Sequence, residues 1–196
     1  MEEIRRRQLI EATIASIHDV GFADASVKSI AARAGVSAGI VHHYFEDKGE
    51  LLEATMRQLA VNLSRSVVRR QRAAKTPAHR LMAVVDGNLG PELFTAEAVS
   101  AWLAFWSQVP TNPRLARIQT VIIRRLHSNL VHALRPFLRD PEVQHVAQDL
   151  ACLIDGIWLR AALHPSGPNG ADARRAAIDF ITRHLKIKVG ETPWTS

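Results

Sequence analysis

Ser26 to Lys48, with the sequence SVKSIAARAGVSAGIVHHYFEDK, decides the fold of the N-terminal part of the chain. The stretch predicts two short helices joined by a tight turn. Ser26 can cap the first helix, and Gly35 tolerates the positive φ that a helix C-cap often needs. Ser37 can cap the second helix, which we expect to reach Phe45. This geometry is typical of a helix-turn-helix, whose second helix enters the major groove of DNA.

The exposed face of the predicted second helix carries side chains that suit DNA. Val41 and Phe45 are four residues apart and are expected to face inward together. An ordinary pair of core helices would explain these apolar positions, but not the run of outward-facing residues beside them. The candidate DNA-contacting residues are Lys28, Ser37, Ala38, Gly39, Ile40, His42, His43, Tyr44 and Lys48.

Several of these residues fit particular contacts with a duplex. Gly39 has no side chain and allows close backbone approach, and Ile40 can pack on a thymine methyl group. His42, His43 and Tyr44 suit phosphates and base acceptors. Lys48 opens the next expected helix, over the DNA backbone. We therefore expect Ile40 to influence sequence preference and Tyr44 to contribute evenly on every sequence.

The whole segment resembles the helix-turn-helix of the TetR family of bacterial regulators. The resemblance implies an all-α dimer with a DNA-binding head and a sensor domain. Several positions coincide with the family pattern at fixed spacing, which makes the match specific. They are Ile30-Ala31, Ala34-Gly35-Val36-Ser37, Gly39, His42-His43-Tyr44-Phe45, Lys48 and Leu51.

The formal net charge of +6 suits a polyanionic partner, but the excess does not lie in the head. Residues 1–48 hold seven acidic and six basic side chains. DNA binding must therefore rest on the placement of single cations, such as Arg5 to Arg7, and on backbone N–H groups. A second basic cluster either helps to attract DNA or is a solvated helix end; it comprises Arg65, Arg69, Arg70, Arg72 and Lys75.

Composition places few further limits on the function. The chain has 196 residues, of which 47% are hydrophobic, so it can bury a sizeable core. Cys152 is the single cysteine, which excludes a disulfide framework and a cysteine zinc site. We expect no signal peptide, no membrane partner, no cofactor and no metal, and a cytoplasmic location, because the N-terminus is charged and no apolar run could span a bilayer.

Apolar periodicity predicts an all-α fold of about nine helices. We divide the chain into a DNA-binding head at 1–47, a ligand-binding and dimerisation domain at 48–188 and a disordered tail at 189–196. Beyond the helix-turn-helix, the expected helices span 4–20, 48–72, a segment opened by Pro77, the apolar segment 91–110, 115–138, 142–163 and a last helix that Asp172 caps and that reaches Lys188.

The last two expected helices offer a wider apolar stripe than one small domain should expose. Two explanations are open, an internal core or an interface with a second copy. The family resemblance implies a four-helix interface in a homodimer, and a helix-turn-helix protein needs two heads to bind a two-fold site. The stripe consists of Leu150, Leu153, Ile154, Ile157, Leu163, Ile178, Ile181 and Leu185.

Aromatic residues are concentrated in the expected sensor. Trp102 and Trp106 are four residues apart with Phe105 beside them, and Trp158 follows Asp155 by three residues on a later helix. Tryptophan faces with a nearby carboxylate suit a quaternary ammonium, which cation–π attraction stabilises. Tryptophans of a helical domain also commonly belong to its core, and spacing alone does not exclude that interpretation.

Beyond the head, the chain resembles the BetI branch of the family, the choline-responsive repressors of glycine-betaine synthesis genes. The matching segments are Ile4-Arg5-Arg6, residues 8–13, 37–40 and 43–45, Asp47-Lys48, residues 54–57, Gly87-Asn88, residues 102–106 and 153–160. Leu89 departs from that branch, so the effector implied is choline or a related quaternary amine. His42 also departs from it, and that difference bears on the operator. The candidate cage is Trp102, Phe105, Trp106 and Trp158, with Asp155, Asp86 or Glu97 as the counter-charge.

The resemblance also implies a mechanism, in which effector binding moves the long connecting helix and changes the spacing of the two heads. Three alternatives remain beside it. An enzyme lacks support, because no catalytic constellation, nucleotide-binding motif or metal-ligand spacing is present. A helical adaptor would not need the exposed face of the helix-turn-helix. A regulator of the same family could instead sense a drug, a fatty acyl compound or another hydrophobic ligand.

Overall fold

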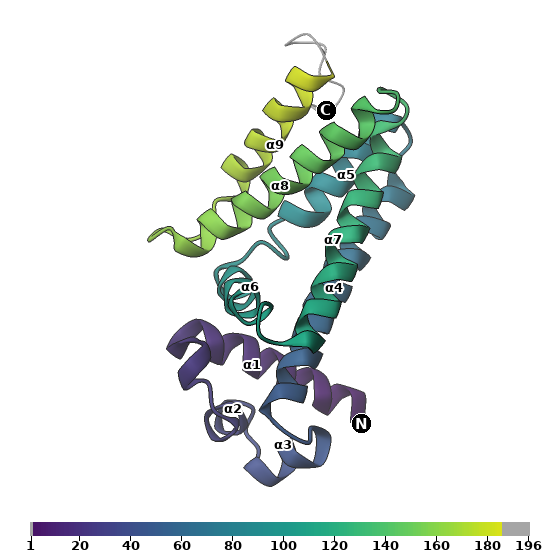
Figure 1. Cartoon of the computed structure of the whole chain (residues 1–196). Helices are drawn as coiled ribbons and strands as arrows, with labels where there is room; N and C mark the ends of the chain where they lie inside the picture. Colours follow the sequence, from purple (N-terminus) through teal and green to yellow (C-terminus); the bar gives the residue numbers. More distant parts are fainter. Residues whose placement is uncertain (1, 186–196) are drawn as a thin grey trace. The chain divides into compact units, whose positions relative to one another are not determined.

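The computed structural model describes residues 2–185, which form nine α helices and no strand (Figure 1). The prediction of an all-α fold is therefore confirmed. The predicted tail and the end of the last helix lie outside the described residues. The helices are α1 (Glu2–Asp24), α2 (Val27–Arg33), α3 (Ala38–Tyr44), α4 (Lys48–Ala73), α5 (Pro77–Leu89), α6 (Ala96–Gln108), α7 (Pro113–Leu134), α8 (Glu142–Leu163) and α9 (Gly170–His184).

The described residues form two compact units. The first unit contains residues 2–61 and 96–119, and the second contains residues 62–95 and 120–185. The first unit thus adds the first half of α4, all of α6 and the beginning of α7 to the three helices of the predicted head. The functional division into a head at 1–47 and a sensor at 48–188 stays a prediction.

The core of the first unit contains the apolar residues that the helix-turn-helix pattern predicts to face inward. Val41 and Phe45 are each 1% exposed and pack with Ile30 of α2 and Leu9 of α1. Leu51 of α4 closes the same cluster. Burying these side chains fixes the angles between α1, α2, α3 and α4, of which α2 and α3, with seven residues each, are too short to be stable alone.

The predicted turns and caps of the head are largely present. The Ser26 side chain accepts a hydrogen bond from the Ser29 backbone N–H at 3.1 Å, and Gly35 has a φ of +68°. Gly21 ends the regular part of α1 with a φ of +79°. Ser37 has the extended backbone of an N-cap, but its side chain makes no capping hydrogen bond. Helix α3 ends at Tyr44, with Phe45 as its C-cap, one residue earlier than predicted.

Helix α6 packs against α1 within the first unit. His18 Nδ1 of α1 lies 3.0 Å from Ser100 Oγ of α6, and Ser100 Oγ also donates to the Ala96 carbonyl. Trp102 and Phe105 bury their rings in this unit. The helix that carries the tryptophan pair is therefore attached directly to the first helix of the DNA-binding segment.

Three further predicted helix ends were wrong, each for a local reason. Helix α6 begins at Ala96, because residues 91–94 form turns. Helix α7 ends at Leu134 and not at 138, since Pro136 lacks an N–H and disfavours helical backbone before it. Asn169 caps α9 through a hydrogen bond from the Asp172 N–H at 3.2 Å, so Asp172 lies in the first turn instead.

In the second unit, α5 meets α4 backbone to backbone at Gly87. A methyl group at this position would lie 2.5 Å from Val67 Cγ2 and 2.8 Å from Val67 Cα. Asn88, buried beside it, donates from Nδ2 to the Val84 carbonyl at 2.7 Å. The small residue is required here because the neighbouring atoms belong to a helix backbone that cannot turn aside.

We expect Gly87→Ala to destabilise the protein by about 1–3 kcal/mol, because the added methyl overpacks a helix crossing. Thermal unfolding followed by circular dichroism would show a Tm lowered by about 2–10 °C. Gly170→Ala is the matched control, since its methyl would meet only the Leu89 carbonyl at an ordinary 3.6 Å. Equal Tm values for both variants would contradict the close crossing.

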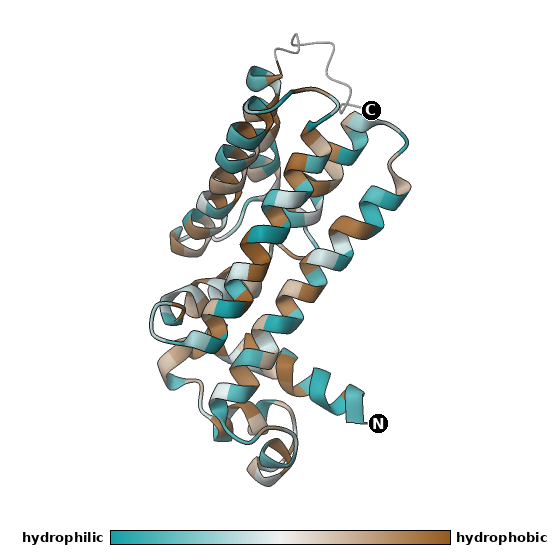
Figure 2. Cartoon of the chain, turned by 45° about the vertical axis from the view of Figure 1, so that its right-hand side comes forward, coloured by the Kyte–Doolittle hydropathy of each residue, from teal (hydrophilic) through white to brown (hydrophobic). Residues whose placement is uncertain are grey.

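The apolar stripe of α8 and α9 is partly core and partly surface. Leu150, Ile154 and Ile181 are at most 1% exposed and hold the two helices together. Leu163 of the stripe remains 66% exposed, and Leu159, which the stripe did not include, is 41% exposed. Figure 2 shows hydrophobic and hydrophilic residues alternating along the helices of this unit. The explanation as an internal core therefore holds for the buried residues, and an interface with a second copy stays a prediction for the exposed one.

Candidate functional site

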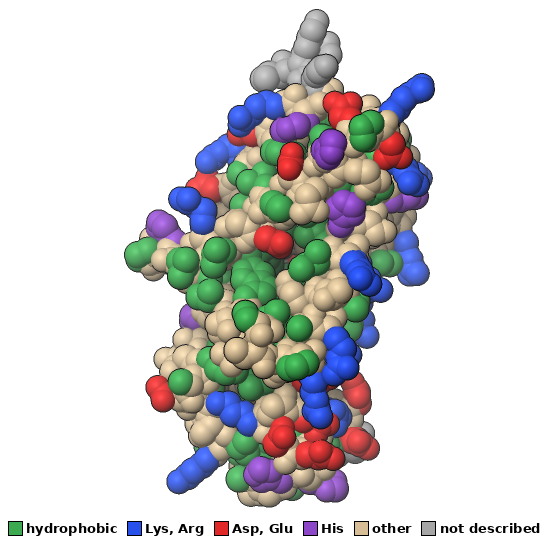
Figure 3. Space-filling model, in the orientation of Figure 1, with side chains coloured by type: hydrophobic (Ala, Val, Ile, Leu, Met, Phe, Trp, Pro, Cys, Tyr) green, Lys and Arg blue, Asp and Glu red, His purple; other side chains and the backbone are tan. Residues whose placement is uncertain are grey.

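Helix α3 presents most of the predicted DNA-contacting residues on its open side. Ser37, Ala38, Gly39, His42 and His43 are exposed. Ile40 is 39% exposed, and Tyr44 is half-buried against the core of the head. Figure 3 shows histidine side chains at the surface over α3, with acidic side chains beside them. A short helix with a buried inner face and an open outer face has the form that fits a major groove.

Arg6 fixes the end of α3 from helix α1. Its Nη1 donates to the Tyr44 carbonyl at 2.9 Å, and its guanidinium lies 4.5 Å from the centroid of the Phe45 ring. Sequence reasoning grouped Arg6 with cations placed for phosphate and missed this role. The contact joins residues 38 positions apart, so no local pattern reveals it.

Lys48 has a similar positioning role at the start of α4. Its Nζ donates to the Phe22 carbonyl at 3.2 Å and lies 5.3 Å from the centroid of the Phe22 ring. This contact ties α4 to the link that follows Gly21. Lys28, by contrast, is exposed on α2. Of the two predicted lysine contacts, Lys28 is therefore the one that is open to a phosphate.

In the first unit, α6 brings together three of the candidate effector-binding aromatics. The ring centroids of Trp102 and Trp106 are 6.1 Å apart with the ring planes inclined by 35°. Trp102 is 3% exposed and Phe105 is fully buried, whereas Trp106 is half-buried. The buried Nε1 of Trp106 has no hydrogen-bond partner among the described residues. Glu97 is exposed in the first turn of α6.

In the second unit, Trp158 packs edge-to-face on Phe94, with ring centroids 5.0 Å apart. Phe94 belongs to the turns before α6, and sequence reasoning missed it. Asp155 is exposed, but surrounding protein atoms still desolvate its carboxyl and raise its pKa from 3.8 to about 6. Asp86, the third candidate counter-charge, is already paired, because its Oδ1 accepts from Arg174 Nε at 2.7 Å.

Residues 2–185 hold neither a membrane-spanning helix nor a cluster of metal-binding side chains. None of the helices in residues 2–185 is long and apolar enough to cross a membrane. Within the same residues, no group of three or more histidine, cysteine or acidic side chains is placed to hold a metal ion.

Comparison with protein families matches both halves of the chain. Residues 9–55 match the family described as bacterial regulatory proteins of the tetR family. Residues 77–186 match the family described as BetI-type transcriptional repressor, C-terminal. The first match covers the helix-turn-helix, and the second covers α5 to α9.

Relatives of known name are similar over nearly the whole chain. The chain is 45% identical to the HTH-type transcriptional regulator BetI 1 of Chromohalobacter salexigens, over 98% of this chain and 96% of that protein. It is 46% identical to the regulator BetI of Escherichia coli K12, over 94% of this chain and 96% of the relative. These relatives are named as transcriptional regulators, in agreement with the expectation of a regulator and not an enzyme.

Solved structures show the same fold. A transcriptional regulator from Pseudomonas aeruginosa PAO1 aligns with a TM-score of 0.81 and 27% identity, over 95% of this chain and 93% of that one. A regulator from Saccharomonospora viridis, solved in complex with choline, aligns with a TM-score of 0.79 and 22% identity, over 90% of this chain and 94% of that one. The chain belongs to the TetR family of bacterial transcriptional regulators, and its C-terminal part is of the BetI type.

Proposed function

We propose that this regulator is a homodimeric repressor that binds a palindromic operator and is released by choline or a related quaternary amine. The observation that carries the proposal is the open face of α3, held on a fully buried core in a chain of the TetR family. Candidate base contacts are Gly39 and Ile40 at the beginning of α3. Candidate phosphate contacts are Lys28, His42 and His43.

Two observations support the homodimer. Leu159 and Leu163 are exposed on α8, the helix that the family resemblance assigns to the dimer interface. An operator with two-fold symmetry requires two copies of α3, one for each half-site, about 34 Å apart. A single head offers a seven-residue helix, which is a small contact surface for specific binding.

Two sets of residues support a quaternary ammonium effector, one in each unit. The first is the Trp102 and Trp106 pair of α6, and the second is Trp158 with the Asp155 carboxyl on α8. Tryptophan is the ring with the strongest attraction for a cation. The relatives named BetI and the choline-bound structure from Saccharomonospora viridis point to the same class of effector.

The contact between α6 and α1 supports a route from effector to head. An effector that touches Trp106 shifts α6, and α1 is joined to α6 through His18 and Ser100. Helix α1 also carries Arg6, which holds the end of α3. The effector changes operator affinity only by the ratio of its affinities for the DNA-binding and released states.

The test is a gel shift of the full chain with DNA flanking its own gene, with and without millimolar choline. A shift that choline abolishes is the expected result. A shift that choline leaves unchanged would contradict the effector and retain the repressor, and the assay would then be repeated with a fatty acyl ligand. That arm is chosen because a regulator of fatty acid degradation from Bacillus halodurans has the same fold, with a TM-score of 0.75.

We expect Ile40→Ala to change sequence preference at one operator position by about 1–3 kcal/mol, the usual value of one base contact. Tyr44→Phe is the comparison variant and should weaken binding modestly and evenly. Titrations on a set of single-base operator variants would separate the two patterns. Equal losses on every operator variant for Ile40→Ala would exclude its role in base recognition.

We expect choline affinity to fall at acidic pH if the Asp155 carboxylate contacts the effector. A raised pKa means that the carboxyl is neutral below about 6 and charged above it. Affinity should therefore be full near pH 8 and about tenfold weaker near pH 5. Calorimetric titration of wild type and Asp155→Asn would check this, since the variant should bind weakly at every pH. A variant that keeps the wild-type pH profile would rule out Asp155.

A further inference from the structure

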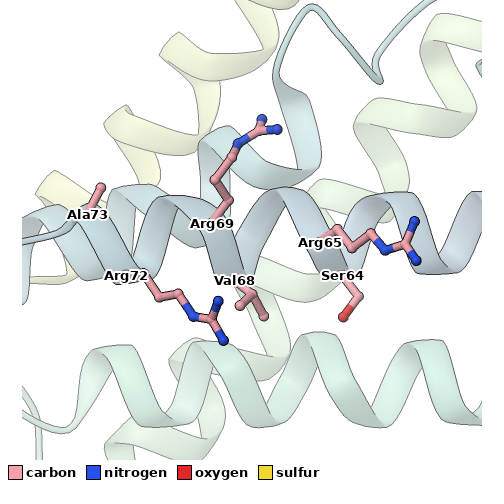
Figure 4. A pocket seen from close by; sticks show the side chains of 6 residues that line it. All are labelled: Ser64, Arg65, Val68, Arg69, Arg72 and Ala73. Atoms are coloured by element: carbon pink, nitrogen blue, oxygen red, sulfur yellow. The ribbon is translucent and has the colours of Figure 1, made fainter.

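The C-terminal half of α4 borders a groove in the second unit that neither the head nor the candidate effector residues use. The groove has a volume of about 630 Å³, and its lining residues are Ser64, Arg65, Val68, Arg69, Arg72 and Ala73. In Figure 4, Ser64, Val68 and Arg72 point toward α7, whereas Arg69 extends away from it. Helix α7 contributes a further cation at the rim, since Arg125 Nη1 donates to Ser64 Oγ at 2.8 Å.

Positive charge around this groove is poorly compensated. Glu92 is the carboxylate that pairs with its arginines, and it is shared between Arg69, at 2.9 Å, and Arg70. The pKa of Glu92 is lowered mainly by a backbone hydrogen bond and further by the two arginines. The Glu92 carboxylate is therefore charged at neutral pH. Arg65 and Arg72 have no ion-pair partner among the described residues. Several guanidinium groups on adjacent helical turns repel one another unless an anion lies between them.

The groove also offers a small apolar surface between the charges. Val68 is 40% exposed among the arginines, and Ala73 is exposed at the end of α4. The volume is within the range of small-molecule sites, about 300–1,000 Å³. Guanidinium groups bind phosphate oxygens in pairs, with charge-assisted hydrogen bonds. A solvated helix end would not need the hollow that these residues line.

We propose that this groove binds a small polyvalent oxyanion, a compound that bears a phosphate or pyrophosphate group. Arg65 and Arg72 supply the unpaired guanidinium groups, and Arg125 adds a positive charge from α7. The compound gives the sensor a second, anionic ligand beside the cation proposed above. The proposal does not rest on choline or on operator binding.

The test uses inorganic pyrophosphate as the probe and isothermal titration of the full chain near 0.15 M salt, where weak surface attraction is screened. Wild type should show saturable binding. The double variant R65Q/R72Q should bind at least about tenfold more weakly, because two charge-assisted contacts are lost. The matched control R80Q/R139Q removes two exposed arginines of the same unit and should stay within about twofold of wild type.

A third variant examines the competing carboxylate. Glu92→Gln keeps the shape of the side chain and frees Arg69 and Arg70, so pyrophosphate should bind about threefold or more tightly. Absence of saturable binding, or equal losses in both double variants, would overturn the proposal. Loss of affinity for random-sequence duplex DNA in R65Q/R72Q, without pyrophosphate binding, would also overturn it and would assign the arginines to the DNA backbone. Neither result would bear on the operator or on choline.

Discussion

Phe45→Ala is expected to abolish operator binding by loosening the support of α3. The Phe45 ring is 1% exposed, closes the core of the head and lies under the Arg6 guanidinium. Truncation of a fully buried phenylalanine costs about 3–5 kcal/mol, through lost contacts and the cavity left behind. Operator affinity should fall by more than about a hundredfold, since a binding-competent head would become a minor state.

Fluorescence anisotropy with a labelled operator would measure this loss. The measurement needs a control that leaves both the core and the candidate DNA contacts intact, and Asp24→Asn serves because Asp24 is an exposed residue of the same unit outside the candidate contacts. Phe45→Leu is a second control, which refills most of the cavity and should recover part of the affinity. Unchanged operator binding by Phe45→Ala would show that α3 does not depend on the core described above.

Trp106→Ala is expected to remove most of the response to choline while the repressor still binds DNA. Trp106 is half-buried, in contrast to its neighbours Trp102 and Phe105, so its ring is the one of the three that an effector can reach. A desolvated cation–π contact is worth up to about 2 kcal/mol, which corresponds to a loss of choline affinity of about thirtyfold. Calorimetric titration of choline into the free protein would measure the change.

Trp106→Phe distinguishes the two roles that a tryptophan can have at this position. Phenylalanine keeps an apolar ring but attracts a cation less strongly, so choline affinity should fall to an intermediate value. If Trp106 were only a packing residue, Trp106→Ala would lower the Tm and leave choline affinity unchanged. That outcome would contradict a role for α6 in effector binding.

Features of the head that depend on neighbouring residues could be predicted from the sequence. Ser26 caps α2, Gly35 takes a positive φ, and Val41 and Phe45 face inward, because each depends on spacing within one or two turns. The wrong ends of α7 and α9 also have local causes. The Arg135-Pro136 step and the competition between Asn169 and Asp172 as caps were visible in the sequence.

Contacts between distant parts of the chain could not be predicted in this way. Arg6 donates to the Tyr44 carbonyl across 38 positions, and Arg174 pairs with Asp86 across 88. Side-chain type makes such partners possible, but only the packing of helices selects them. The second of these pairs matters for the effector, because it satisfies a carboxylate that the sequence offered as a counter-charge.

Effector and operator are proposed to bind different states of one protein, and thermodynamic linkage between the two ligands is the direct test. Choline affinity would be measured by calorimetry for the free dimer and for the dimer saturated with operator. We expect choline to bind the operator complex more weakly than the free dimer. The factor should equal the one by which saturating choline weakens operator binding. Equal choline affinity for the free and the DNA-bound protein would contradict this proposal.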